Sequence, residues 1–162
     1  MTAGRPESAR ETALAAGGAD GPDGPDGPRG VTGVELHVAD VEASIAFYEA
    51  LGFRVARRWE DWVRLDRDGA ELVLQGDAYI RGHEHYFTPH IDRSPRGTGV
   101  EITIEVDDVD AIHAAAVAAG LRIVKPIQDR AWKARDFRLA DPDGFFIRIT
   151  SPLRHEATSA TL

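Results

Sequence analysis

Two stretches of this chain, ADVEASIAFYEALGFRV at residues 39–55 and DDVDAIHAAAVAAGLRI at residues 107–123, superpose without a gap. Asp40 matches Asp108 in this superposition, 68 residues further along the chain. A constant offset over so many positions indicates a duplicated module rather than two unrelated segments. The fold is therefore expected to contain the same unit twice.

Each repeated stretch has the signals of one helix. Asp40 and Asp108 stand where a side chain caps the first turn, before a run with apolar residues at helical spacing. Gly52 and Gly120 follow these runs, where a left-handed residue commonly ends a helix. We therefore predict one helix between the Asp and the Gly of each copy.

Strand signals surround each predicted helix. VELHV at 34–38 and VEITIEV at 100–106 precede the two helices. Short strands are expected at 53–59, 62–66 and 70–75 in the first copy, and at 121–125, 135–140 and 145–150 in the second. An Asp-Gly turn joins the last two strands of both copies. The predicted fold class is α+β, with two tandem βαβββ modules.

The final hairpin, RDFRLADPDGFFIRIT at 135–150, has apolar residues at alternate positions. Side chains on a strand point to opposite faces in turn, so Ile147 and Ile149 share a face with Phe137 and Leu139. Arg148 then lies on the other face. A charged residue at this position needs either water or a partner.

Composition changes at both ends of the chain. Residues 1–30 are rich in Gly and Pro and contain no Val, Ile, Phe, Tyr or Trp, so this segment is expected to be disordered. The last residues are expected to be frayed. The predicted boundaries are a tail at 1–30, module one at 31–76, a joining loop at 77–97, module two at 98–152 within one domain at 31–152, and a tail at 153–162.

Charge and composition exclude several classes of function. The chain has no cysteine, which excludes disulfides and thiolate nucleophiles. Its net charge is −8 and its 19 basic residues form no block, which argues against a nucleic-acid surface. No apolar run approaches the roughly 18 residues of a membrane span, and no secretory signal is visible. We expect a cytoplasmic protein without nucleic-acid or membrane partners.

The duplicated module, the run VADVEASIAFYEALGF at 38–53 and the closing DPDG at 141–144 resemble the vicinal oxygen chelate superfamily. That group includes glyoxalase I, extradiol dioxygenases, fosfomycin-modifying enzymes and bleomycin resistance proteins. The resemblance covers residues 31–152 and implies the glyoxalase/bleomycin resistance fold, a cup-shaped half-barrel of mixed sheet. It does not fix the function, because such folds carry unrelated chemistries.

The resemblance implies that metal ligands would stand at Gly33, Val73, Glu101 and Arg148. Of these four, only Glu101 can bind a cation, and a guanidinium stays protonated and repels one. We therefore expect no cofactor. Arg148 is expected to face into the cup, where it pairs with Glu101 or holds an anionic group of a ligand.

Several further residues are candidates for a ligand-binding site. Alternation along the strands places Glu35 and His37 on the inward face, and His37 is also a candidate general base. The same face of module two would carry Glu101, Thr103 and Arg148.

Three tryptophans are candidates to stack on a flat ligand, with core packing as the alternative. They are Trp59, Trp62 and Trp132. Trp132 lies in DRAWKARDF, which resembles the AWGxxxF stretch of bleomycin resistance proteins, with Lys133 in place of the glycine.

The resemblance is strongest to the metal-free bleomycin resistance proteins. It implies a homodimer that binds and sequesters a planar, cationic, drug-like molecule in a cleft, and so confers antibiotic resistance. The alternative is a glyoxalase-, isomerase- or dioxygenase-like enzyme with a divalent transition metal relocated to His83, His85 and His90 with Glu101. A protein-interaction module is also left open. Without the metal, these histidines belong to a loop whose Tyr86 and Phe87 cover the cup.

Overall fold

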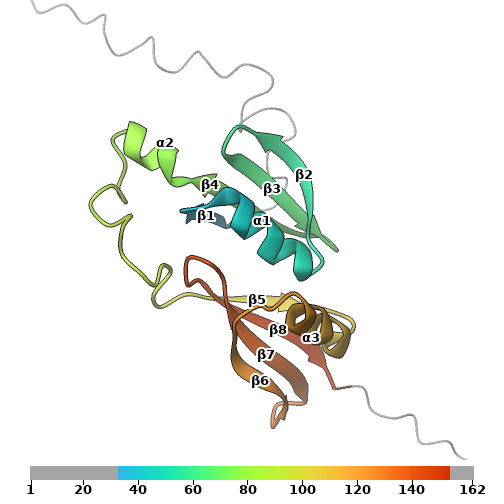
Figure 1. Cartoon of the computed structure of the whole chain (residues 1–162). Helices are drawn as coiled ribbons and strands as arrows, with labels where there is room; N and C mark the ends of the chain where they lie inside the picture. The colour runs from blue at the N-terminus through green and yellow to red at the C-terminus, as the bar shows by residue number, and fades with distance from the viewer. Residues whose placement is uncertain (1–32, 154–162) are drawn as a thin grey trace, which may run out of the picture.

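The computed structural model describes residues 33–153, and the elements of this range follow the order βαβββ twice (Figure 1). Module one contains β1 (Glu35–Val38), α1 (Val41–Ala50), β2 (Arg54–Trp59), β3 (Trp62–Arg67) and β4 (Ala70–Gly76). A short helix, α2 (Asp77–Gly82), follows it. Module two contains β5 (Glu101–Glu105), α3 (Val109–Ala118), β6 (Ile123–Arg130), β7 (Ala134–Ala140) and β8 (Phe146–Pro152). The predicted α+β fold class is confirmed.

Each module forms its own four-stranded mixed sheet. The strand orders are β1-β4-β3-β2 and β5-β8-β7-β6, with the first strand parallel to the last one in both modules. Glu35 pairs with Val73 in the first sheet, and Thr103 pairs with Arg148 in the second. The two modules therefore share one register, as expected of a duplication.

Helix caps fall where the sequence predicts them. Asp40 accepts a hydrogen bond from the Ala43 amide at 3.0 Å, and Asp108 accepts one from the Ala111 amide at 3.0 Å. Both glycines that follow the helices have positive φ. An N-cap of this kind contributes about 1 kcal/mol, so the repeated Asp fixes the start of each helix.

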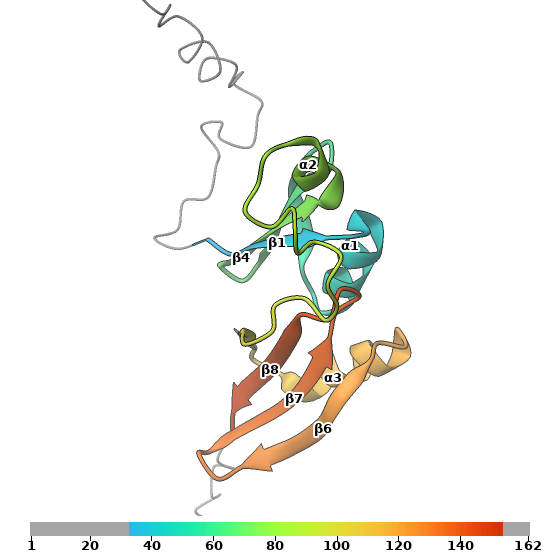
Figure 2. The same cartoon turned by 90° about the vertical axis from the view of Figure 1, so that its left-hand side faces the viewer.

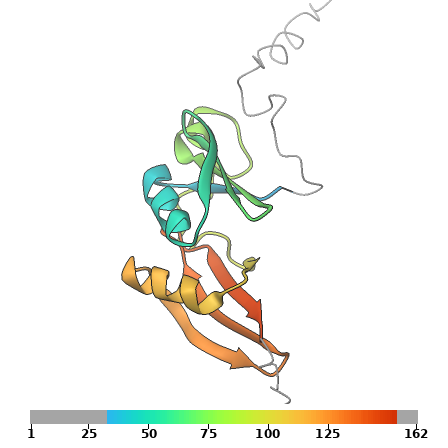
Figure 3. The same cartoon turned by 90° about the vertical axis from the view of Figure 1, so that its right-hand side faces the viewer.

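The core lies between each sheet and its helix and continues from one module to the other. Leu36 and Val38 of β1 are buried against it, as are Phe137, Leu139, Ile147 and Ile149 of the final hairpin, whose predicted alternation is confirmed. α1 and α3 contact each other and lie side by side (Figure 3). The opposite face of each sheet carries no helix of its own module; Figure 2 shows that face for module two. We call it the open face.

Two secondary-structure predictions are wrong. Residues 77–82, predicted as loop, form α2, whose Ile80 is fully buried. β6 continues to Arg130, although its end was predicted at 125, just before Pro126. β6 is an edge strand with an irregular register between Lys125 and Gln128, so the missing N–H of Pro126 interrupts no regular pairing.

The terminal tails predicted from composition lie outside the described residues, apart from Leu153. Within residues 33–153, no helix is long and apolar enough to cross a membrane.

The turn at 141–144 joins the modules. Both carboxylate oxygens of Asp143 accept from the Ala39 amide, at 3.1 Å each. The buried Tyr48 hydroxyl donates to Asp141 at 3.1 Å, and Asp141 also accepts from the amides of Asp143 and Phe145. The turn of module two therefore accepts hydrogen bonds from two groups of module one: the Ala39 amide just before α1 and the Tyr48 hydroxyl within α1.

The joining loop packs closely on this turn. Gly144 has φ +89°, and a Cβ added to it would lie 2.6 Å from Cβ of Pro95. Gly69, in the matching hairpin of module one, has φ +86° but no atom within 4 Å of such a Cβ. A side chain would therefore strain the backbone at both positions, but only at Gly144 would its Cβ also collide with a neighbouring residue.

We expect Gly144→Ala to lower the free energy of unfolding by about 3 kcal/mol, because left-handed strain and overpacking add. Gly69→Ala carries only the strain and should cost about 1–2 kcal/mol. Urea unfolding of both variants measures the difference. Equal losses would show that the loop does not pack on the turn as described.

The buried carboxyl of Asp141 makes the stability of the folded chain depend on pH. Burial raises the pKa of this carboxyl to about 6 from an ordinary value of 3.8. Between these values the folded chain binds more protons than the unfolded chain, so its contribution to stability is lost as pH rises. Asp141→Asn removes this loss, while its amide oxygen still accepts from the turn amides.

We expect the unfolding free energy of Asp141→Asn, relative to the parent, to rise by up to about 3 kcal/mol over that pH range. Urea unfolding at several pH values measures it. Glu49→Gln, a change on an exposed residue of α1, is the control and should show no such trend. A flat difference for Asp141→Asn would contradict the raised pKa.

Candidate functional site

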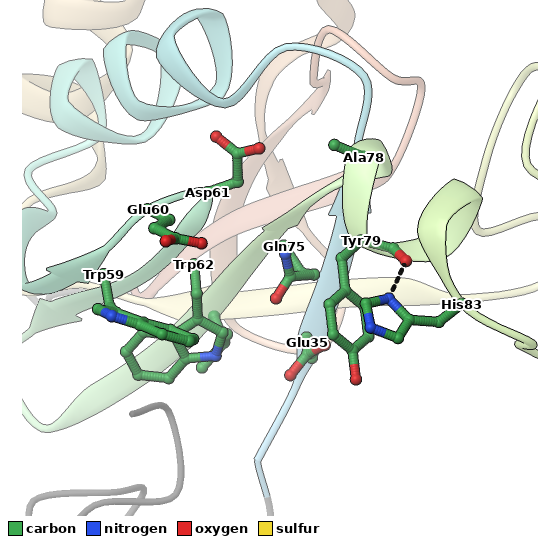
Figure 4. A pocket seen from close by; sticks show the side chains of 10 residues that line it. Glu35, Trp59, Glu60, Asp61, Trp62, Gln75, Ala78, Tyr79 and His83 are labelled. Atoms are coloured by element: carbon green, nitrogen blue, oxygen red, sulfur yellow. Dashed lines mark hydrogen bonds between the residues drawn. The ribbon is translucent and has the colours of Figure 1, made fainter. Parts of the chain in front are cut away.

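A pocket of about 450 Å³ opens on the open face of module one (Figure 4). Its floor comes from β1 and β4, one wall from the β2–β3 hairpin, and the other wall from α2. We call it the acidic aromatic pocket. Its lining residues are Glu35, Trp59, Glu60, Asp61, Trp62, Val73, Gln75, Ala78, Tyr79 and His83.

The hairpin wall follows from a two-residue turn. Glu60, with φ +51°, and Asp61 connect Trp59 to Trp62, which pair directly across the strands. Residues paired in this way share a face, so both indoles point to the pocket. Trp62 is buried and Trp59 is 43% exposed, and their rings lie next to each other in Figure 4. This wall offers a large flat apolar surface.

The helix wall carries a second aromatic pair. Tyr79 and His83 are four residues apart, which places them on one face of the helix end. Their rings stack with centroids 4.5 Å apart and planes inclined by 29°. Nδ1 of His83 lies 2.8 Å from the carbonyl oxygen of Tyr79, which holds the imidazole in place. Figure 4 shows this pair across the pocket from the two tryptophans.

The pocket is negatively charged. Glu35 stands on the floor, while Glu60 and Asp61 stand at the hairpin turn (Figure 4). In the described part of the chain, no Lys or Arg lines this pocket. The three carboxylates of the lining give a potential that attracts positive charge.

Arg96 holds the pocket's floor and helix wall together. Its guanidinium donates to both carboxylate oxygens of Asp77, at 2.7 Å each, and to the carbonyl oxygen of His37 at 2.7 Å. Its Nε lies 3.2 Å from Asp143. One side chain therefore connects α2, β1 and the turn of module two.

His37 lies on the open face, as predicted, but the joining loop covers it. Its ring contacts those of His85 and Phe87, with centroids 5.2 and 5.4 Å away, and its Nε2 lies 3.7 Å from Glu35. Burial, followed by the charge of His85, lowers the pKa of His37. Phe87 therefore covers the sheet as expected, whereas Tyr86 is 80% exposed. His37 does not line the pocket, so no general-base geometry is present there.

The open face of module two carries a chain of ion pairs. Nε of Arg148 lies 2.5 Å from Glu101, one of the two roles predicted for this arginine. Arg138 lies 3.8 Å from Glu101 and 3.3 Å from Asp136, which is fully buried and also binds Arg130 at 2.6 Å. Three guanidiniums thus share two carboxylates, leaving this cluster of ion pairs with one excess positive charge.

The model of the Glyoxalase/Bleomycin resistance protein/Dioxygenase superfamily matches residues 30–149. The chain belongs to this superfamily. The match spans both modules and the site described above.

Several solved structures of the superfamily's fold are similar to this chain. A glyoxalase/bleomycin resistance protein/dioxygenase from Nocardioides is 25% identical, with a TM-score of 0.60, and the match covers 83% of this chain and 90% of that one. TioX from Micromonospora sp. ML1 is 26% identical, with a TM-score of 0.57 and coverages of 74% and 96%. A bleomycin-binding protein complexed with bleomycin is 22% identical, with a TM-score of 0.56 and the same coverages, which shows a shared fold alone. No curated protein matches the chain.

The superfamily's metal positions do not fit a metal ion in this chain. The side chains of Gly33 and Val73 offer no donor atom. The carboxylate of Glu101 is held by Arg148, whose guanidinium is itself a cation. No chemical step through a metal at these four positions follows from the structure.

The alternative set of ligands is not assembled either. His83 stacks on Tyr79, and His85 lies against the His37 ring. His90 contacts only an exposed tyrosine ring among the aromatic side chains described. Within residues 33–153, no three His, Asp or Glu side chains are grouped closely enough to hold a metal ion.

Sequence reasoning found one wall of the pocket and missed the other. The predicted residues Glu35, Trp59 and Trp62 come together in it. Tyr79 was missed, and His83 was considered only as an alternative metal ligand, because their segment was expected to be loop. Their four-residue spacing was the available signal, and it becomes meaningful only once a helix is assigned to 77–82.

The remaining predicted residues lie elsewhere. Thr103 pairs with Arg148 in the sheet of module two. Trp132 is 60% exposed on the β6–β7 hairpin, 5.8 Å from the Arg130 guanidinium, and does not line the pocket. Lys133 has φ +60°, a left-handed conformation that glycine, the residue at this place in the resembling stretch, adopts more readily.

Proposed function

We propose that this chain is a metal-independent small-molecule-binding protein that holds a planar, cationic, drug-like ligand in the acidic aromatic pocket. The observation that carries the proposal is the combination of two facing aromatic pairs with three carboxylates and no lining Lys or Arg in the described residues. Flat aromatic walls favour a flat ligand, and the carboxylates favour a positive one.

Magnitudes support this choice of ligand. A volume of about 450 Å³ suits a small drug-like molecule, for which pockets span roughly 300–1,000 Å³. Stacking on each aromatic pair contributes about 0.5–1.5 kcal/mol beyond burial, and a cation over an indole contributes about 1–2 kcal/mol more. A cation leaving water also needs a counter-charge, which the three carboxylates supply.

Binding, rather than reaction, is the function that the lining residues favour. The described residues that line the pocket include no serine, threonine, cysteine or lysine nucleophile, and we assign its carboxylates, Tyr79 and His83 to charge, stacking and hydrogen bonding with the ligand. The bleomycin-binding protein of the same fold was solved with bleomycin, which supports drug binding as a function that this fold can have. We propose sequestration of a toxic ligand, and hence antibiotic resistance, over a glyoxalase- or dioxygenase-like activity.

We further propose a homodimer, with a second copy covering the open faces to form the ligand cleft. The cluster of ion pairs on the open face of module two has one excess guanidinium, which is complementary in charge to the negative pocket of module one. β1 and β5 are each an edge strand of their sheet, and edge strands also favour association. The dimer and the cytoplasmic location stay predictions.

The proposal predicts selective binding of a planar cation. Calorimetric titration of the EDTA-treated protein should show binding of proflavine, a flat three-ring cation, and none of anthracene-9-carboxylate, a flat three-ring anion. Glu35→Gln should weaken proflavine binding about fivefold, because a partly exposed charge pair contributes about 1 kcal/mol. Added salt should weaken it further.

Glu49→Gln is the matched control, since it removes the same charge from α1, outside the pocket. It should leave the affinity unchanged. Binding of the anion in preference to the cation, or loss of proflavine binding after metal removal, would contradict the proposed function.

A further inference from the structure

The tautomer of His83 follows from its one hydrogen bond. Its Nδ1 faces the Tyr79 carbonyl oxygen at 2.8 Å, and a carbonyl oxygen only accepts. Nδ1 therefore carries the hydrogen, and in the neutral ring Nε2 has a lone pair. Among residues 33–153, no donor is bound to Nε2 of His83. The helix wall thus offers a hydrogen-bond acceptor to the pocket.

The other polar groups of the pocket are also mainly acceptors. The ionised side chains of Glu35, Glu60 and Asp61 accept and do not donate. Each indole of the hairpin wall has one N–H donor, the amide of Gln75 both donates and accepts, and the Tyr79 hydroxyl can act in either sense. Acceptors therefore outnumber donors, and they lie on the floor, at the hairpin turn and at the helix wall (Figure 4).

When a ligand covers an acceptor and offers it no N–H or O–H group, the acceptor loses its hydrogen bond to water and gains none in return. That loss costs about 1–3 kcal/mol for each buried group, and more for a charged one. A site of this kind discriminates strongly against a ligand that lacks the matching N–H groups. Charge and flatness alone are then not sufficient for tight binding.

We propose that the acidic aromatic pocket selects planar cations that carry N–H groups at their edges. Amidines, guanidines and amino-substituted heteroaromatic cations belong to this class, and permethylated or quaternary ammonium cations do not. This inference rests on the proposed function and names the chemistry of its ligand. The flat ring stacks between the aromatic pairs while edge N–H groups donate to carboxylates of the lining and to Nε2 of His83.

Two dyes test the inference. Proflavine and acridine orange are flat three-ring cations with the same ring nitrogen, and acridine orange has dimethylamino groups where proflavine has amino groups. Calorimetry on the full chain should give proflavine an affinity at least about tenfold higher, equivalent to one lost hydrogen bond to a charged group. His83→Phe keeps a ring to stack on Tyr79 and removes the acceptor, so it should reduce that ratio severalfold.

Each outcome separates the inference from the proposed function. Equal affinities for the two dyes, or a higher affinity for acridine orange, overturn the N–H selectivity and leave a planar-cation binder. Binding of neither dye overturns both. An unchanged ratio in His83→Phe overturns the role of Nε2, and the wild-type comparison does not depend on how that variant folds. Glu49→Gln again serves as the control and should keep the full ratio.

Discussion

The guanidinium of Arg96 is the interaction on which the site depends. It is 13% exposed and bonds to the Asp77 carboxylate, the His37 carbonyl oxygen and Asp143. A buried guanidinium without partners would be strongly destabilising, so these three groups fix one another's positions through it. Because Asp77 begins α2 and His37 belongs to β1, the helix wall of the pocket is held at a set distance from its floor.

The same sheet serves the core and the site through its two faces. Leu36 and Val38 face α1 in the core, which leaves Glu35 on the face where the pocket opens. In module two this alternation buries Ile147 and Ile149 and places Arg148 beside the carboxylate of Glu101. In this chain, the open face carries the Arg148 guanidinium in module two and the acidic aromatic pocket in module one. The two modules therefore share a backbone and differ in charge.

The sequence was sufficient to predict what depends on local period and repetition. The offset of the two copies located the helices and their Asp caps, and alternation placed Glu35 and Arg148 on the correct faces. The sequence was not sufficient where contacts between residues far apart in the chain decide the local structure. α2 exists because Ile80 is buried and Asp77 meets Arg96, 19 residues later, and no local pattern in 77–82 indicates that. The same contact brings Tyr79 and His83 opposite the tryptophans, so half of the pocket was invisible to sequence reasoning.

The central claim is that a ligand lies between the hairpin wall and the helix wall of module one. The chain has three tryptophans, and only two of them, Trp59 and Trp62, line the pocket in the described structure. A ¹H–¹⁵N correlation spectrum with assigned indole N–H signals, recorded during titration with proflavine, tests the claim directly. The account predicts that the signals of Trp59 and Trp62 move with the ligand and that the signal of Trp132 moves least. Movement of the Trp132 signal alone, with the other two unchanged, would contradict it.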